Sequence, residues 1–514
     1  MNRDRLKRLY HLHSLIGIAF GWMVFVVVFS GIPALFYEEM KTWEDPANRI
    51  VLQQEPIELL PLLENLIEEE AKGKEIESIF SLLPTAMHPF YELRLRAEDP
   101  QTGDHIELVR KWNPNDGMPI AERGEGFSTW LTDFHRNFMI EGTVGRALVG
   151  LVGVFLLISV VTGVLTHRKM IAEMFTWRLD RSVRLKWQDT HKILGLWGLP
   201  YAAMIAFTGA FLGLLVIMLP ATALLVFNGD REAIGDALSG PPVVETGVMS
   251  EMHLFNPLRE RAAEAVGRMP ERLTIQRWGD ESAHYVFLYK IEGHLLRYGS
   301  YVVSGSSGDF IENRLTQGPG AAWRVVSSIT PLHYATYGGI WLKVLYAVLA
   351  VGLCVVIATG SMMWLERRLH GNEGRWSNTT YRILGHLTTG IMTGVILTSA
   401  ALFHVDTVIS VDPENRLFWI GVSYFSIWIL AIGYTLLRRN DYRACREILA
   451  ASALFLVAIP LSNAVFKGAA VSHVYAPEHA FVWGVDLAGI VLGILMIVVT
   501  FYLPRKRMVG MKSA

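Results

Sequence analysis

The feature that most constrains this chain is a series of long apolar runs. Eight runs can be counted, at about 15–37, 146–166, 193–218, 342–364, 387–404, 417–437, 447–466 and 481–503. A bilayer hydrocarbon core of about 30 Å needs about 20 helical residues, which is the length of these runs. Backbone groups inside lipid have to be hydrogen-bonded within their own segment, so the runs are predicted to be helices. The sequence therefore predicts a mainly α-helical membrane protein with about eight transmembrane helices.

Lysine and arginine are concentrated in the connections on one side of the predicted spans. A basic stretch from Arg3 to Arg8 precedes the first span, and arginines recur in the connections after the second, fourth and sixth spans. The short connections after the fifth and seventh spans carry only Arg416 and Lys467. Because the Lys and Arg residues of short loops remain in the cytoplasm, both termini are predicted to be cytoplasmic.

Two long segments fall on the opposite side, and each is predicted to be a small α+β unit. In the first, we expect a helix at 56–71 and strands at 77–82, 90–96 and 105–111. In the second, we expect a helix at 257–266 and strands at 272–278, 284–290 and 297–303. Since the order of elements is the same, each unit with its two flanking spans is predicted to be one copy of a repeat. Functional sites of repeated membrane proteins usually lie between the copies.

The predicted division of the chain follows from these patterns. It comprises a first transmembrane helix in 1–37, a first outer unit in 38–145, two transmembrane helices in 146–227, a second outer unit in 228–341, a fourth helix in 342–370 and four additional helices in 371–514.

Several function classes lack their signatures in this sequence. The net charge is −1, so no nucleic-acid partner is indicated. Membrane lipid is the expected partner. The two cysteines form no Cys-x-x-Cys-His sequence for covalent haem and no paired-cysteine zinc site. No phosphate-binding loop, His-Glu-x-x-His or dinucleotide fingerprint is present, which argues against an ATP-driven pump, a zinc protease and a built-in NAD(P)H or flavin module.

A histidine recurs at the basic end of several spans. His13 is followed eighteen residues later by Gly31, and His191 is followed eighteen residues later by Gly209. A third copy begins at His386 but has His404 at the eighteenth position in place of glycine.

Histidines also recur near the opposite ends of the spans. His135 precedes Gly163 by 28 residues, and His333 precedes Gly360 by 27. Each of these glycines follows a threonine. We expect the glycines to let neighbouring helices pack closely.

Histidines at matched depths of several membrane helices indicate a cofactor. Haem iron takes axial imidazoles from opposite faces of a flat ring, and therefore from facing helices. Without an attachment sequence, such haem would be held non-covalently. The candidate ligands are His13, His191, His135 and His333, with His167, His386 and His404 in reserve. The alternative is that these histidines are amphipathic residues at the membrane interface.

Other ionisable residues have simpler expected roles. Asp486 lies within the last span, where a carboxylate is costly, so it is a functional candidate. Asp406 is expected to be a solvated loop charge. The histidines of the two outer units, His105 among them, are expected to be surface groups for which a minor metal-binding role stays open.

These residues resemble the PepSY-associated transmembrane family, whose members include bacterial inner-membrane ferric-siderophore reductases. The similarity covers about residues 5–370 and rests on the segments 13–31, 189–209 and 332–360, with their repeated histidines and Ser-Gly or Thr-Gly pairs. By position, His13 and His191 match the inner-side histidines of the family, and His135 and His333 match the outer-side ones.

The resemblance implies two periplasmic PepSY-like units and two haem b groups in the bacterial inner membrane. It also implies electron transfer from a cytoplasmic or quinol donor to a ferric chelate, or siderophore, in the periplasm. Two other functions stay open: a transporter for an iron chelate or haem, and a PepSY-type binding or regulatory protein. The resemblance covers the first four spans only, and the last four lie outside it. The third histidine-glycine copy indicates that these last four spans pack on the core.

Overall fold

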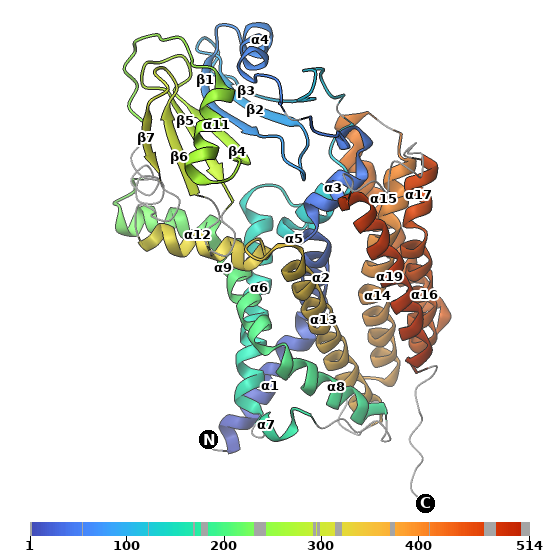
Figure 1. The fold of residues 1–514 in the computed structure, drawn as a ribbon. Helices are drawn as coiled ribbons and strands as arrows, with labels where there is room; N and C mark the ends of the chain where they lie inside the picture. Colours follow the sequence, from blue (N-terminus) through green and yellow to red (C-terminus); the bar gives the residue numbers. More distant parts are fainter. Residues whose placement is uncertain are drawn as a thin grey trace, which may run out of the picture.

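Helices form a bundle at one end of the molecule, and a β-sheet stands at the other (Figure 1). The structure is a computed structural model, and it describes residues 3–53, 55–121, 123–167, 170–175, 183–230, 243–290, 295, 299–313, 321–370, 376–410, 412–466 and 480–504. Much of the basic connection predicted after the second span lies outside these residues, as does the start of the strand predicted at 297–303.

Within the described residues, seven helical segments are long and apolar enough to cross a membrane. They are α6 (Gly142–Thr166), α9 (Leu199–Val226), α13 (Gly339–His370), α14 (Asn378–Val408), α15 (Arg416–Arg438), α16 (Asp441–Val457) continued by α17 (Ile459–Phe466), and α19 (Ala480–Tyr502). They match seven of the predicted runs. The chain is therefore a mainly helical, multi-pass membrane protein, as predicted.

The remaining run, predicted as one span at about 15–37, is a bent pair of helices. α1 (Arg3–Ala19) and α2 (Gly21–Ala34) meet at an angle of 65°, and counting the pair as one span gives eight. Phe20 at the corner stacks on Phe155 of α6, with ring centres 3.7 Å apart. The bend lays α1 along α6 and directs the chain into α2 at a different slope.

The helices of the two predicted repeats follow the same order, except that α3 of the first has no counterpart in the set given for the second. The first contains α1, α2, the short helices α3 (Tyr37–Glu44) and α5 (Phe127–Asn137), and α6; the second contains α8 (Val183–Trp197), α9, α12 (Ala321–Tyr334) and α13. α6 and α9 pack closely, because a methyl group on Gly213 would lie 2.5 Å from Cα of Gly150. Here the small residues do bring two membrane helices together, as expected of glycine.

The two outer α+β units join in one antiparallel sheet. Its order is β3-β2-β1-β4-β5-β6-β7. The strands are β1 (Glu75–Leu82), β2 (Tyr91–Glu98), β3 (His105–Trp112), β4 (Arg272–Gln276), β5 (His284–Tyr289), β6 (Gly299–Ser304) and β7 (Phe310–Asn313). β1 of the first unit pairs with β4 of the second, with Ile79 opposite Ile275. Each unit thereby covers the exposed strand edge of the other, which would otherwise invite aggregation.

One apolar core lies between this sheet and two helices, α4 (Leu60–Glu70) and α11 (Phe255–Val266). Leu63 of α4 and Leu258 of α11 are both buried in the core that contains the strand residues Leu93 and Phe287. The alternating burial of the strands provides the inward face.

The C-terminal helices α14 to α19 pack beside the two repeats. Asp486 of α19 is 2% exposed and accepts hydrogen bonds from Trp43 Nε1 at 2.8 Å and Asn463 Nδ2 at 2.9 Å. This carboxylate therefore ties α19 to α3. The expectation of a solvated Asp406 was wrong, because this side chain is buried at the end of α14 and forms an ion pair with Arg416 at 2.5 Å.

Candidate functional site: two histidine pairs

The structure brings His13 of α1 and His191 of α8 together at the end of the bundle away from the sheet. Their ring centres are 6.3 Å apart, and the ring planes are inclined by 76°. Since α1 belongs to the first repeat and α8 to the second, the pair lies between the copies. We call it the inner pair.

His135 of α5 and His333 of α12 form a second pair on the side that bears the sheet (Figure 1). Their ring centres are 6.2 Å apart, and the planes are inclined by 23°. Again one histidine comes from each repeat. We call this the outer pair.

Each of the four imidazoles lies against a glycine of another helix of its own repeat. A methyl group on the glycine would lie within 2.9 to 3.4 Å of the ring carbon Cε1. The four contacts are His13 on Gly163 of α6, His135 on Gly31 of α2, His191 on Gly360 of α13 and His333 on Gly209 of α9. The contact at Gly31 is too short for a real side chain and the other three are tight, so the glycines make room for the rings.

The expectation that these glycines serve close helix packing is therefore replaced by a more specific role. The eighteen-residue spacing joins an inner histidine to the glycine beneath an outer histidine, one span length away. The spacings of 28 and 27 residues join an outer histidine to the glycine beneath an inner one. Both kinds of spacing therefore reflect the same contact, a histidine ring against a glycine, which each repeat makes at both ends of the bundle.

In each case, the helix that supplies the glycine also supplies the hydrogen-bond partner of the ring's Nδ1 atom. Acceptor carbonyls lie at 3.0 Å for His13 (Ser159), 2.9 Å for His135 (Val27) and 2.8 Å for His191 (Val356). For His333 the partner is Thr208 Oγ1 at 3.0 Å, and this hydroxyl donates its own hydrogen to the Met204 carbonyl.

These contacts determine the tautomer of the rings. A carbonyl oxygen only accepts, so Nδ1 has to carry the hydrogen, and Nε2 then keeps its lone pair. A histidine that binds a metal through one nitrogen commonly donates the other N–H to a carbonyl, which orients the ring. The hydroxyl of Ser30 also lies 3.3 Å from His135 Nδ1, and the sequence showed Ser30 and Thr208 only as the residues before the repeated glycines.

The outer imidazoles are also kept neutral by their surroundings. Burial lowers the pKa of His135, and burial together with the neighbouring His135 lowers the pKa of His333 to about 3. A neutral imidazole is the form that binds a metal. The protonation state that ligation requires is thus present before any ligand binds.

The spacing of each pair fits two ligands of one metal ion. With metal–nitrogen bonds of about 2 Å, two imidazoles on opposite sides of an ion have ring centres about 6 Å apart. The observed separations are 6.3 and 6.2 Å. The donor set, two neutral imidazoles per site from facing helices, is one that haem iron accepts.

The three reserve histidines lie outside the two pairs. His167 follows the last residue of α6, and His386 lies on α14, where its backbone carbonyl accepts a hydrogen bond from Thr435. In the third copy of the motif, the position eighteen residues after His386 is His404, where the other two copies have the glycine that lies against an imidazole.

His404 is held within the C-terminal helices. Its Nδ1 lies 2.5 Å from Ser462 Oγ, and its Nε2 lies 2.8 Å from the Phe455 carbonyl oxygen. Both ring nitrogens are therefore engaged with protein atoms, and a role as an iron ligand would require these contacts to break.

Comparison with known proteins shows the family to which this region belongs. The family model of the PepSY-associated TM region matches residues 10–367, which include all four paired histidines and all four glycines beneath them. The chain is also 28% identical over 346 residues to an uncharacterized protein, PA4219, of Pseudomonas aeruginosa, a match that covers 65% of this chain and 86% of that protein. The resemblance seen in the sequence is confirmed, and helices α14 to α19 lie beyond the family's region. The chain belongs to the PepSY-associated transmembrane family.

Proposed function

We propose that this protein is a b-type haem oxidoreductase of the bacterial inner membrane. It passes electrons from a quinol or a cytoplasmic donor to a ferric chelate, such as a ferric siderophore, in the periplasm. In this proposal the termini are cytoplasmic and the sheet is periplasmic. Bound haem would supply the one-electron chemistry that amino-acid side chains lack.

The observation that carries the proposal is the matching construction of two histidine pairs at opposite ends of the bundle. His13 and His191 would hold one group, and His135 and His333 the other. Nδ1 contacts orient each ring and leave Nε2 as the donor atom. The four glycines that lie against the rings leave space for each imidazole in its oriented position.

The ends of the bundle would have different tasks. The inner pair lies at the end where α1 and α8 begin, so a donor from the cytoplasmic side has the shorter approach to it. The outer pair lies beneath the shared sheet, so a ferric chelate would be received on that side (Figure 1). Reduction favours release of the iron, because ferrous iron binds hard oxygen ligands less tightly than ferric iron does.

The proposal is tested first by the haem content of the purified full-length protein. About two haem b per chain are expected in the pyridine haemochrome assay. A protein that is produced with haem available and still shows no Soret band would overturn the proposal.

Activity is tested in proteoliposomes. With a quinol donor in the membrane and a ferric chelate outside, a ferrous-specific dye should report reduction in the wild type and in His386→Ala. His333→Ala should reduce the chelate much more slowly. Chelate uptake without any added reductant would favour a transporter instead.

A further inference from the structure

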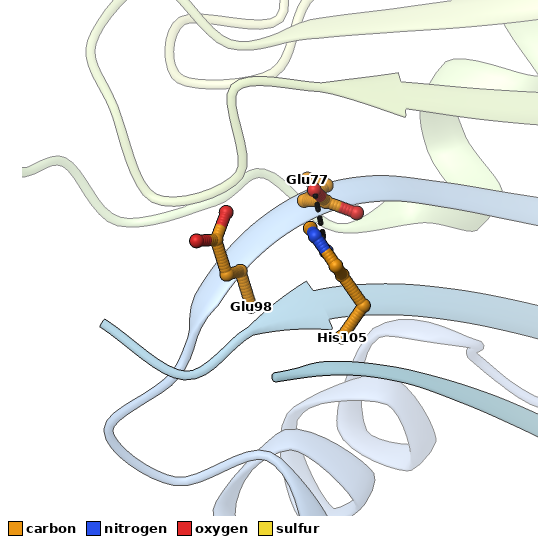
Figure 2. Close-up of side chains that lie close together, drawn as sticks. All are labelled: Glu77, Glu98 and His105. Atoms are coloured by element: carbon orange, nitrogen blue, oxygen red, sulfur yellow. Dashed lines mark ion pairs between the residues drawn. The ribbon is translucent and has the colours of Figure 1, made fainter. Parts of the chain in front are cut away.

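A group of metal-binding side chains lies at the end of the sheet, away from both histidine pairs. Glu77 of β1, Glu98 of β2 and His105 of β3 direct their polar atoms toward one another (Figure 2). One ligand atom from each residue lies within 4.8 Å of the others. Among the residues that the structure describes, this is the group that could hold a metal ion with such spacing.

The backbone of the sheet determines this arrangement. Glu98 and His105 are directly opposite each other on β2 and β3, so their side chains lie on the same face. β1 has an irregularity between Ile76 and Ser78, and Glu77 is the additional residue there. A bulge of this kind turns a side chain away from the regular alternation, and here Glu77 joins the cross-strand pair.

The side chains around Glu98 carry a net negative charge that a bound cation would offset. Glu75 is directly opposite Glu98 on the adjacent strand, a like-charge pair that destabilises a sheet when nothing compensates it. The nearby cations form ion pairs with other carboxylates: Lys74 with Asp99 at 3.5 Å, and Arg96 with Glu107 at 3.1 Å.

The donor set specifies the class of ion. We propose that Glu77, Glu98 and His105 form an exchangeable site for a divalent transition-metal ion such as Zn²⁺ or Fe²⁺. Imidazole together with carboxylate oxygen suits these ions better than it suits Mg²⁺ or Ca²⁺, which prefer oxygen alone. Three protein ligands leave coordination positions open to water, and a hollow of about 320 Å³ lies beside Glu77 and His105.

The simpler account of the group is an ion pair between His105 Nδ1 and Glu77 Oε1, which are 3.1 Å apart. Within the part of the chain that the structure describes, that pair does not offset the charges of Glu98 and the opposed Glu75. A divalent ion engages all three ligand residues and reduces the repulsion between the two glutamates. The proposal is independent of haem binding, since it concerns the sheet alone.

Zn²⁺ titration of the tag-free, full-length protein by calorimetry tests the site. Wild type should bind one Zn²⁺ at this site, and His105→Ala and Glu98→Gln should each weaken its binding about tenfold or more, a change of about 1.4 kcal/mol. Glu107→Gln is the matched control, because Glu107 is a neighbouring carboxylate on the same strand that is outside the group. It should change Zn²⁺ affinity less than twofold.

Two results would overturn the assignment. Unchanged Zn²⁺ binding in His105→Ala and Glu98→Gln would leave only the ion pair. Equal weakening by Glu107→Gln would mean that cations collect diffusely on an acidic surface. Because the His105 side chain is exposed and Glu98→Gln keeps the shape of its side chain, both variants should fold, and unchanged circular dichroism would verify this for each.

Discussion

The inner and outer histidine pairs are built alike but supported differently. In both, one imidazole from each repeat lies against a glycine and is oriented through Nδ1. The ring planes differ, at 76° in the inner pair and 23° in the outer pair. Similar sequence motifs thus produce two sites of different geometry.

The outer pair has a further asymmetry between its two helices. α5, which carries His135, packs against both the first repeat and the C-terminal helices. Trp130 of α5 packs on Tyr424 with ring centres 4.3 Å apart, and a methyl group on Gly421 would lie 2.9 Å from Trp130 Nε1. Glu44 of α3 also accepts hydrogen bonds from Ser128 N at 3.0 Å and Oγ at 2.8 Å in the first turn of α5.

α12, which carries His333, packs mainly on α9 of its own repeat. The additional helices α14 and α15 therefore reinforce one half of the outer pair. The comparison indicates that the C-terminal helices stabilise the position of His135.

Removal of single ligands should have the largest effect and should separate the two sites. His191→Ala and His333→Ala are each expected to lower haem content by about half, since one imidazole cannot hold the group as firmly as two. The double variant should retain little haem. His386→Ala, which carries the same sequence motif, should bind as much haem as wild type; an equal loss there would contradict the pairing.

Filling the space beneath the rings should weaken the sites in the order of the contact distances. Gly31→Ala places a methyl group 2.9 Å from His135, Gly360→Ala one at 3.1 Å from His191 and Gly163→Ala one at 3.4 Å from His13. Overpacking of this kind costs about 1–3 kcal/mol, so haem retention should fall about fivefold or more for Gly31→Ala and least for Gly163→Ala.

Gly17→Ala is the control for this series, because nothing lies within 4 Å of a methyl group there. It should retain the wild-type haem content. If Gly17→Ala and Gly31→Ala lost haem equally, the effect would come from helix propensity and not from contact with the imidazole.

The different ring angles should be visible in electron paramagnetic resonance of the oxidised protein. The angle between two axial imidazole planes influences how the iron d orbitals split. We therefore expect two low-spin ferric signals, with the more anisotropic one belonging to the inner pair. That signal should disappear in His191→Ala and persist in His333→Ala, and a single signal for both sites would contradict the comparison.

The smallest expected effect concerns an ion pair on the outer side. Glu38 of α3 lies 2.7 Å from His88 Nε2. Burial alone would raise the pKa of Glu38, but the hydrogen bond and charge of His88, with Lys41 and Arg272, lower it to about 2. A carboxylate whose pKa falls on folding stabilises the fold above its ordinary pKa of 4.5, and this contribution is lost as pH falls toward 2.

The apparent melting temperature of the wild type should therefore decrease as pH falls below about 4.5, by an amount equivalent to about 1–2 kcal/mol after solvent screening is considered. Glu38→Gln should be less stable than wild type at pH 7 and should show a weaker dependence on acid. If the melting temperatures of wild type and Glu38→Gln depended on pH in the same way, the pair of Glu38 and His88 would not contribute to stability.

Much of the architecture could be predicted from the sequence, because a segment inside lipid has to hydrogen-bond its own backbone groups. Apolar runs such as 146–166 and 481–503 had to be helices, and they are. The strand segments 77–82 and 105–111 were predicted from alternation and lie within β1 and β3. The bend between α1 and α2 was not predicted, since the apolar run continues through Phe20 without interruption.

The sequence by itself determined which residues recur: histidine at the span ends and glycine eighteen, 27 or 28 residues beyond. It could not determine that each glycine lies beneath the ring of a different histidine, because that contact joins helices far apart in the chain. For the same reason His386 looked equivalent to His13 and His191. Only the tertiary structure distinguished them, because packing between helices brings His13 and His191 together against facing glycines, whereas His386 lies on α14 outside both pairs.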